Sequence, residues 1–444
     1  MKSIFKVFSI TVAIVALACE SLAAQSASGG TYGFYSPYSA YGIGDLSMEG
    51  TAYNHTLGGT GIATRNKRYV SFTNPASITC RDSLSFLADF SVESVNSMYL
   101  QNGQKSAKNT FNMHSIAMTF PIWRSSAFVV GFTTFSNRGY DFASKIEDQS
   151  IIGQTGIVEN TASGQGSLND IFIAAAATFW NRLSVGAQFS YLFGKYSKYS
   201  RLIYSSTSYS SDYSGYEYFL SAYTGKFGLQ YEEHFGKNFS MIIGATYRLS
   251  TKLRGDCEDY LMGYHSATVL IDTLRYEKID LAKENLRIGD ELGVGISVNI
   301  ADKVNVEFNY LRGHWSNSGF DSFDAFKVES KEVKYQAGTM QSFRLGVEYV
   351  PNRNDVRYYH KRMSYRAGGY FTQSPYRVNG GPTINYGVTL GLTFPVFRWY
   401  NGVSIGIDFG RYELPGSNLV SQNYVKFVLG FNLHDYWFHK SQYN

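Results

Sequence analysis

From Leu84 onward, apolar residues recur at every second position in a long series of short stretches. This is the period of a β-strand that has one apolar and one polar face. Residues 239–249 and 384–394 are the clearest cases, with apolar residues at alternate positions and mostly Ser, Gly, Thr, Asn or Arg between them. The chain is therefore all-β, and the way its strands are connected decides between a soluble sandwich and a membrane barrel.

The alternation predicts about fourteen strands. They are expected at residues 83–96, 110–121, 126–140, 168–180, 182–200, 216–232, 238–254, 286–300, 303–315, 337–350, 358–372, 383–395, 400–412 and 423–433. Connections after even-numbered strands are short, whereas those after odd-numbered strands are mostly long, at 141–167, 201–215, 255–285 and 316–336. An even strand count with turns at one end and long loops at the other is typical of an outer-membrane antiparallel β-barrel. Soluble Greek-key sandwiches do not sort their loops in this way.

The N-terminus indicates export. A basic start, an apolar run over residues 7–18 and small residues up to Ala24 predict a signal peptide that is cleaved after Ala23 or Ala24. A lipoprotein site at Cys19 is the less favoured alternative, because Ala16 stands where a Leu would be expected. No later stretch has the roughly 18 uninterrupted apolar residues of a membrane helix. We therefore expect the chain to be located in the cell outer membrane as a multi-pass β-barrel.

Aromatic residues support the barrel. The chain has 36 Tyr, 32 Phe and 43 Gly but only 8 Pro and 3 Cys, which does not fit a disulfide scaffold. Trp123, Trp180 and Trp399 fall at predicted short turns and Trp437 follows the last strand, so four of the five Trp residues lie on one rim. Such a rim is expected of an aromatic girdle at a membrane interface.

Nothing in the sequence indicates catalysis or a cofactor. Outside the signal peptide, Cys80 precedes the first strand and Cys257 falls in a predicted loop, and their positions suggest neither a disulfide bridge nor a metal site. The eight His residues are scattered without ligand spacing, so we expect no metal, no cofactor and no enzyme activity.

The predicted lumen is polar in most sectors. Charged residues occupy inward positions, where they meet water, a plug or one another, because on the lipid face each would cost several kcal/mol. They are Asp89, Glu93, Arg248, Glu307, Arg344, Glu348, Asp408 and Lys426. One wall differs, because residues 128–132 are apolar on both faces and residues 174–177 are all Ala. Either this wall carries a bulge, or Phe128, Val130 and Phe132 form an apolar path; the alternative is that small residues here make room for a plug.

Residues 25–82 lack alternation and precede the first strand on the periplasmic side. We expect this segment to fold into the lumen, because the side chains of a fourteen-stranded barrel cannot fill it. The expected organisation is therefore a signal peptide at 1–24, a hatch at 25–82, a barrel at 83–433 and a periplasmic tail at 434–444.

The hatch segment contains a Gly-Gly-x-Gly run followed by Asn-Pro-Ala. These residues are Gly58, Gly59, Gly61, Asn74, Pro75 and Ala76. Together with fourteen strands, this pattern resembles the FadL/TodX family of long-chain fatty-acid and hydrocarbon transporters, in a divergent Gram-negative branch. The resemblance covers nearly the whole mature chain, but motif-level identity is confined to about twenty residues. It implies a hatch that plugs the barrel and uptake of hydrophobic compounds such as a long-chain fatty acid.

The basic residues Arg65, Lys67 and Arg68 lie between the two motifs. We expect them to form ion pairs with lumen acids such as Glu307 and Glu348 and so to pin the hatch. Binding of a substrate carboxylate is the alternative. The inward Arg344 belongs to the same candidate set of hatch–lumen contacts.

Two functions remain open. The first is transport of a hydrophobic small molecule across the outer membrane, as the resemblance implies. The alternative is a non-transporting barrel subunit of an outer-membrane protein export or assembly complex, which the charged lumen, the long loops and the 434–444 tail would suit. A general porin is disfavoured because a hatch would block the pore. Outer-membrane lipid, a hydrophobic compound and protein subunits are the candidate partners, and nucleic acid is not.

Overall fold

The structure is a computed structural model that describes residues 33–436, apart from 83–84, 124, 147–151, 153–155, 206–210, 237, 266–268, 324, 327–333, 397–400 and 418. The predicted signal peptide, Trp399, Trp437 and the tail beyond Tyr436 lie outside the described residues.

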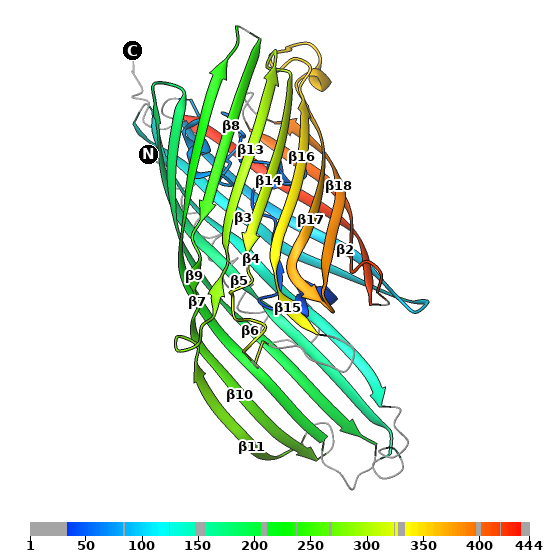
Figure 1. The fold of residues 1–444 in the computed structure, drawn as a ribbon. Helices are drawn as coiled ribbons and strands as arrows, with labels where there is room; N and C mark the ends of the chain where they lie inside the picture. Colours follow the sequence, from blue (N-terminus) through cyan, green and yellow to red (C-terminus); the bar gives the residue numbers. More distant parts are fainter. Residues whose placement is uncertain are drawn as a thin grey trace, which may run out of the picture.

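The predicted fourteen-stranded antiparallel barrel is confirmed (Figure 1). Its strands are β2 (Ser85–Gln101), β3 (Gln104–Trp123), β4 (Ser126–Ile146), β5 (Val158–Phe179), β6 (Leu183–Tyr204), β7 (Ser211–His234), β8 (Phe239–Arg248), β13 (Asp290–Ile300), β14 (Val304–His314), β16 (Thr339–Tyr349), β17 (Ser364–Val378), β18 (Gly381–Pro395), β19 (Gly402–Glu413) and β20 (Ser421–Tyr436). The ring closes where β2 pairs with β20, from Ser85 opposite Tyr436 to Leu100 opposite Ser421.

The alternation of the sequence becomes the two faces of the wall. On β20, Phe427, Phe431 and Leu433 point outward and are exposed, whereas Val428 and Asn432 between them are buried. At the end with short turns, Trp123 and Trp180 have exposed fractions of 76% and 84%. Exposed apolar side chains with aromatic residues at one rim are what a lipid bilayer requires of a barrel exterior.

The wall is taller on one side than the sequence predicts. Strands β4 to β7 run well past their predicted ends, and the expected loop at 255–285 is wrong in part, because it forms the hairpin of β10 (Arg254–His265) and β11 (Val269–Asp280). β10 pairs with β7 and so extends the sheet, which projects beyond the rest of the barrel at the end opposite the short turns (Figure 1). Cys257 consequently lies buried in β10 and not in a loop.

This error has a physical cause. Beyond the bilayer the outward face of a strand need not be apolar, so the alternation fades while the backbone ladder continues. Residues 195–217, rich in Tyr and Ser, show this loss of pattern.

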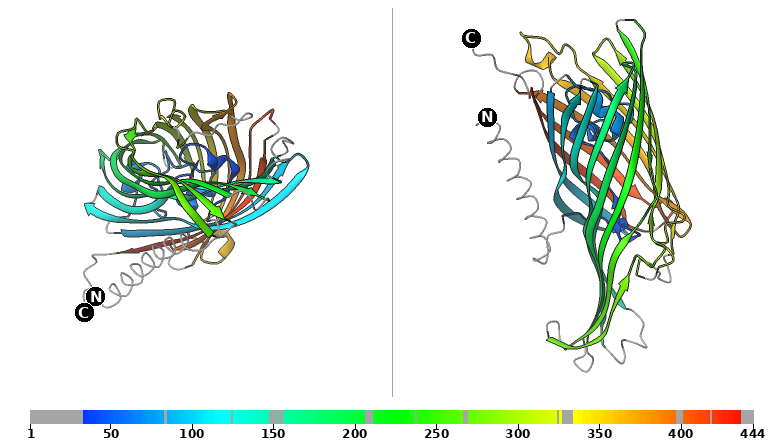
Figure 2. Two further views of the ribbon diagram at one scale, coloured as in Figure 1. Left: turned by 90° about the horizontal axis from the view of Figure 1, so that it is seen from below. Right: turned by 90° about the vertical axis from the view of Figure 1, so that its left-hand side faces the viewer.

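The N-terminal segment, residues 33–82, lies inside the ring of strands (Figure 2, left). It contains only short elements, namely η1 (Pro37–Ala40), β1 (Asp45–Leu46), α2 (Ala52–His55) and η2 (Pro75–Thr79). The remaining short elements are β9 (Thr251–Lys252), β12 (Arg287–Ile288), β15 (Tyr335–Ala337) and η3 (Tyr359–Lys361). In the described part of the chain, no helix has the length and apolar character needed to cross a membrane.

The ladder between β3 and β4 is incomplete. These strands pair from Ser115 opposite Thr133 to Trp123 opposite Ser126, toward the end with short turns. Further along, β4 pairs instead with β1 of the N-terminal segment, with Leu46 opposite Ser136. We call this opening, between residues 104–114 of β3 and 134–146 of β4, the β3–β4 seam.

Candidate functional site

A belt of glycines faces the N-terminal segment from the inner wall. It consists of Gly186, Gly228, Gly244, Gly293, Gly295, Gly346, Gly368, Gly391, Gly406 and Gly430. Many lie directly opposite one another on neighbouring strands, as Gly346 does to Gly368 and Gly391 to Gly406. A Cβ atom added at any of them would approach residues 52–76 to between 2.1 and 3.0 Å. We call these ten residues the glycine belt; it lets the backbone of the segment touch the wall.

The first predicted motif lies against this belt. Gly58 and Gly59 have φ angles of +67° and +77°, a conformation that favours glycine. The turn brings the Gly58 N–H to Thr389 Oγ1 of β18, at 2.9 Å. A side chain at Gly61 would collide with Asn54. These glycines therefore shape a tight turn that is bonded to the wall.

The second motif links two parts of the N-terminal segment, at residues 62 and 74–76, to each other and to the wall. The Asn74 side chain donates to Ile62 O at 2.7 Å and to Leu229 O of β7 at 3.2 Å, and it accepts from Ala76 N–H at 3.0 Å. Pro75 begins η2, which Asn74 caps. Ala76 is completely buried, as is Asn74.

The predicted ion pairs have different partners. Arg65 Nε lies 2.9 Å from a carboxylate oxygen of Glu232 on β7, and not beside Glu307 or Glu348. Lys67, whose side chain is 63% exposed, lies 3.6 Å from Asp82 within the segment itself. The Arg65 side chain is only 9% exposed, so this pair holds the N-terminal segment to the wall largely out of contact with water.

Arg68 contacts the wall through its backbone. Its carbonyl oxygen accepts a hydrogen bond of 2.6 Å from Asn432 Nδ2 of β20. Its N–H donates to Asn66 Oδ1 at 3.0 Å.

Glu307 and Arg344 bind the backbone of the segment. Glu307 Oε1 accepts a 2.9 Å hydrogen bond from the Ala63 N–H, and Arg344 Nη1 donates to Gly59 O at 2.9 Å. Both side chains are at most 9% exposed. A charged group bonded to a backbone group fixes the position of the segment without needing a charged residue on it.

Glu348 pairs with a cation that the sequence did not single out. Arg366 Nε of β17 lies 3.1 Å from its carboxylate. The Arg366 guanidinium also lies over the rings of Tyr53 and Tyr69, at 4.4 and 4.8 Å, and those rings stack on each other. This buried cluster holds α2 against β16 and β17.

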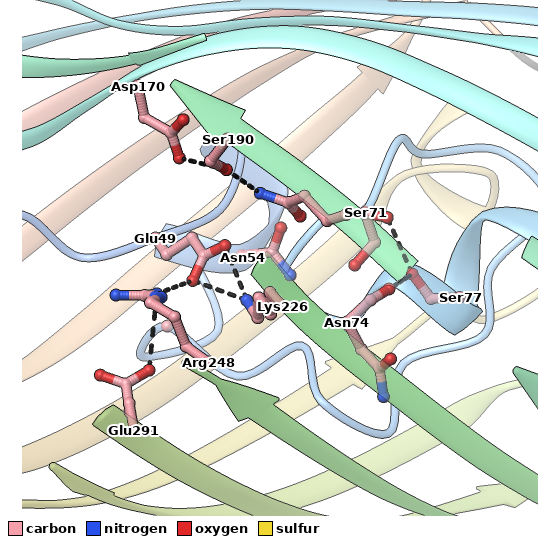
Figure 3. A network of polar contacts seen from close by, with 12 residues as sticks. Glu49, Asn54, Ser71, Asn74, Ser77, Asp170, Ser190, Lys226, Arg248 and Glu291 are labelled. Atoms are coloured by element: carbon pink, nitrogen blue, oxygen red, sulfur yellow. Dashed lines mark hydrogen bonds and ion pairs between the residues drawn. The ribbon is translucent and has the colours of Figure 1, made fainter. Parts of the chain in front are cut away.

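Glu49 is the centre of a second ionic network, which the sequence also did not reveal (Figure 3). Its carboxylate lies 2.7 Å from Lys226 Nζ of β7 and 2.9 Å from Arg248 Nη2 of β8. Arg248 lies 3.6 Å from Glu291 of β13. Burial raises the pKa of Glu49, but the charges of Lys226 and Arg248 outweigh burial and hold this pKa below its ordinary value of 4.5.

The N-terminal segment and the wall enclose a cavity of about 160 Å³. Its charged and histidine lining residues are Asp45, Glu49, His55, Glu93, His114, Asp170, Lys226, Arg248, Glu291, Arg344, Asp408 and Lys426. Typical ligand pockets are larger, about 300–1,000 Å³. This cavity is therefore too small to hold a long apolar molecule.

An apolar cluster lies toward the end with the long loops. Trp315, Phe320 and Phe326, from the connection between β14 and β16, pack with Tyr196 and Tyr218 of the projecting sheet. All five are at most 3% exposed. Residues Tyr38 to Ile43 of the N-terminal segment contribute to the same cluster. We call it the apolar cap.

The residues of the candidate apolar path face outward and not into the lumen. Phe128, Val130 and Phe132 point outward, and Val130 is 41% exposed. The inward residues of this stretch are small, and Ala127 and Val129 pack with Phe72 and other apolar residues of the N-terminal segment. The doubly apolar wall is thus the surface on which the segment packs, as the interpretation that small residues make room for a plug had it.

The sequence did contain a signal for the glycine belt. Gly391 and Gly244 occupy alternate, inward positions in the two clearest strand patterns, and a glycine inside a strand indicates a close backbone approach. Glu49, Glu232 and Arg366 had no comparable signal, because the depth of the segment in the barrel decides which charges meet. In the described part of the chain, no group of three or more His, Cys, Asp or Glu side chains could hold a metal ion.

Solved structures share this fold. The toluene transporter TodX of Pseudomonas putida has a TM-score of 0.61 at 14% identity, over 89% of this chain and 100% of that one. The CymD monoaromatic hydrocarbon channel has 0.58 at 15%, over 88% and 99%. A FadL homologue of Pseudomonas aeruginosa has 0.56 at 12%, over 89% and 100%. The predicted FadL/TodX-like fold and outer-membrane location are confirmed, and two of these neighbours are named as a transporter and a channel.

Sequence comparison identifies the family. No curated protein matches the chain significantly. A family model does match, over residues 6–444 and hence over nearly the whole chain. The protein belongs to the BamG family.

Proposed function

We propose that this protein is a permanently filled barrel that serves as a subunit of an outer-membrane protein assembly or export complex. The observation that carries the proposal is the glycine belt. Backbone atoms and short side chains of residues 52–76 touch the inner wall on nine of the fourteen strands. A segment that has to move would need space between itself and the wall. Here glycines in the wall allow such close contact that no space is left.

The route through the lumen is obstructed at a second level. The apolar cap lies across the route from the long loops, and its aromatic side chains are buried, which supports a closed lumen. Between the cap and the belt lies the small charged cavity around Glu49. An apolar solute would have to displace the water and ion pairs of this cavity, which costs free energy that apolar contacts cannot return.

Family membership supports the same proposal. The BamG model covers nearly the whole chain, whereas the hydrocarbon channels share at most 15% identity with it. Structural similarity at this level of sequence identity shows a shared fold but not a shared function, because one fold can serve unrelated functions.

Uptake of a hydrophobic compound is the second candidate. The fold favours it, since neighbours with the same architecture are named as toluene transporters and a monoaromatic hydrocarbon channel. In this case the compound would cross the cap, enter the cavity and leave sideways through the β3–β4 seam. That route requires both the cap and the Glu49 network to open.

One experiment separates the two candidates. The protein is extracted gently from its native membrane, and both co-purifying proteins and bound lipids are identified. We expect stoichiometric outer-membrane proteins and no apolar compound in the lumen. In parallel, proteoliposomes of this protein and of TodX are compared for toluene uptake. Uptake comparable to that of TodX, by a protein that purifies alone, would refute the proposal.

A further inference from the structure

Within the residues that the structure describes, one strand edge in the wall of this barrel has no partner strand. Residues 104–114 of β3 pair with β2 on one side, from Gln104 opposite Gln101 to Met113 opposite Val92. On the side of the β3–β4 seam, no hydrogen bond between backbone groups joins them to any other described residue. At the end of the stretch, the His114 carbonyl accepts a hydrogen bond of 3.3 Å from the Thr133 side chain of β4. Since successive N–H groups of a strand point to alternate sides, about half of the backbone groups in this stretch face the seam unpaired.

The part of this edge around Phe111 lies at the depth of the bilayer. Phe111 lies opposite Ser94 of β2, which lies opposite Phe427 of β20, within the band of exposed apolar side chains on that strand. Phe111 itself points outward with 64% of its surface exposed. Open sheet edges are not tolerated against lipid, because each unsatisfied backbone group costs several kcal/mol there. Something must therefore cover the edge in the membrane.

The N-terminal segment covers only the other side of the seam. The Ser36 N–H donates to Gly139 O of β4 at 2.8 Å, and the Ser47 N–H donates to Phe135 O at 2.9 Å. Toward β2 and β3 the segment offers side-chain contacts, such as the ring of Tyr35, which lies 5.4 Å from Lys108 Nζ. The seam is thus occupied along β4 and open along β3.

The seam is amphipathic across its thickness. On its inner side it opens onto the charged cavity, whose lining includes Thr110, His114 and Asn137. On its outer side it faces lipid beside Phe111. An apolar small molecule fits the outer side only. A β-strand with alternating polar and apolar side chains fits both, and its backbone satisfies the unpaired groups of β3.

We propose that the edge of β3 at residues 104–114 accepts a β-strand from a partner outer-membrane protein. The strand pairs antiparallel or parallel to β3, with polar side chains toward the cavity and apolar side chains toward the lipid. This inference rests on the proposed function, because the partner is a subunit of the same complex. It adds the place of contact and the kind of segment that binds there.

Site-specific crosslinking in cells tests the proposal. A photoreactive phenylalanine analogue replaces Phe111, and in a matched control it replaces Phe343. Phe343 also faces lipid and is 41% exposed, but β16 is paired there on both sides, with Tyr310 and Phe371. We expect a protein adduct from position 111 and none from position 343. No protein adduct at position 111, or equal adducts at both positions, would overturn the proposal.

Two proline variants add a second readout. Asn109→Pro and Thr110→Pro remove consecutive N–H groups, one of which bonds to β2 while the other points to the seam. We expect the variant that lacks the seam-facing group to fold and to lower the adduct from position 111 by about fivefold or more, since it removes a hydrogen bond and blocks pairing. An unchanged adduct in that folded variant would contradict strand addition.

The outcomes also distinguish this inference from the function on which it rests. If the protein purifies in a complex but position 111 gives no protein adduct, the strand-acceptor proposal fails and the proposed function stands. If the protein purifies alone, the proposed function fails as well.

Discussion

Gly368→Ala is the sharpest test of the glycine belt. A Cβ at this inward position of β17 would lie 2.3 Å from both Gly58 N and Leu57 C. Both are backbone atoms of the N-terminal segment, so no flexible side chain can yield. Ordinary van der Waals contact begins about 1 Å further out, and the segment or the strand must shift by that amount. Overpacking of this kind costs about 1–3 kcal/mol of unfolding free energy.

The next residue in the strand provides the control. A Cβ at Gly369 would meet only Gly387 O, at 3.6 Å, which is an ordinary contact. Gly369→Ala should therefore be neutral or stabilise by about 0.4–1 kcal/mol, since it lowers the entropy of the unfolded chain. Denaturant unfolding of both variants in detergent gives the free energies, and limited proteolysis shows whether residues 52–76 are released.

We expect lower stability and faster cleavage of the N-terminal segment for Gly368→Ala alone. Equal stability of the two alanine variants would refute the idea that the wall is fitted to the segment. Unchanged proteolysis together with lower stability would place the strain in the strand and not in the segment.

Three further predictions concern the network, the packed wall and the cap. Glu49→Gln leaves the buried Lys226 without its carboxylate and Arg248 with the more distant Glu291 alone, and should cost about 3–5 kcal/mol at neutral pH in denaturant unfolding. Because the pKa of Glu49 is lowered in the folded state, the native protein should lose this stability as the pH falls through that pKa, and the variant should show no such loss. Phe72→Ala should cost about 3–5 kcal/mol, whereas the lipid-facing Val130→Ala should change the unfolding free energy by about 0.5 kcal/mol or less, and the reverse order would contradict the assigned faces. Burial raises the pKa of the Cys257 thiol to about 12, so maleimide should not label it in intact cells, whereas Phe320→Ala should open the apolar cap and permit labelling.

The membrane-spanning part of the fold could be predicted because lipid imposes a pattern on the sequence. The last strand was expected at 423–433 and is found at Ser421–Tyr436. Outside the bilayer that constraint disappears, so the sequence pattern predicts a loop where the β10–β11 hairpin lies. Residues 128–132 are ambiguous for a different reason: the inward face packs on an apolar part of the N-terminal segment, so both faces are apolar and the pattern does not tell which one is inside.

The contacts of the lumen could be predicted only by type. The sequence indicated that Arg65 pairs with a wall carboxylate, and it does, but with Glu232. The choice of partner depends on how deep the segment lies and how it is turned within the barrel. No local pattern encodes these two quantities, because they arise from contacts with nine strands at once.

The glycine belt also constrains how the molecule can be made. Residues 52–76 leave no clearance at the wall, so they cannot be inserted into a finished ring. They precede every barrel strand in the chain, and the ring closes only when β20 meets β2. The strands must therefore close around residues 52–76 while these are already in place, so the N-terminal segment serves as the core around which the barrel forms. A barrel assembled without this segment would not be a stable open pore, because its inner wall would lose the contacts against which it packs.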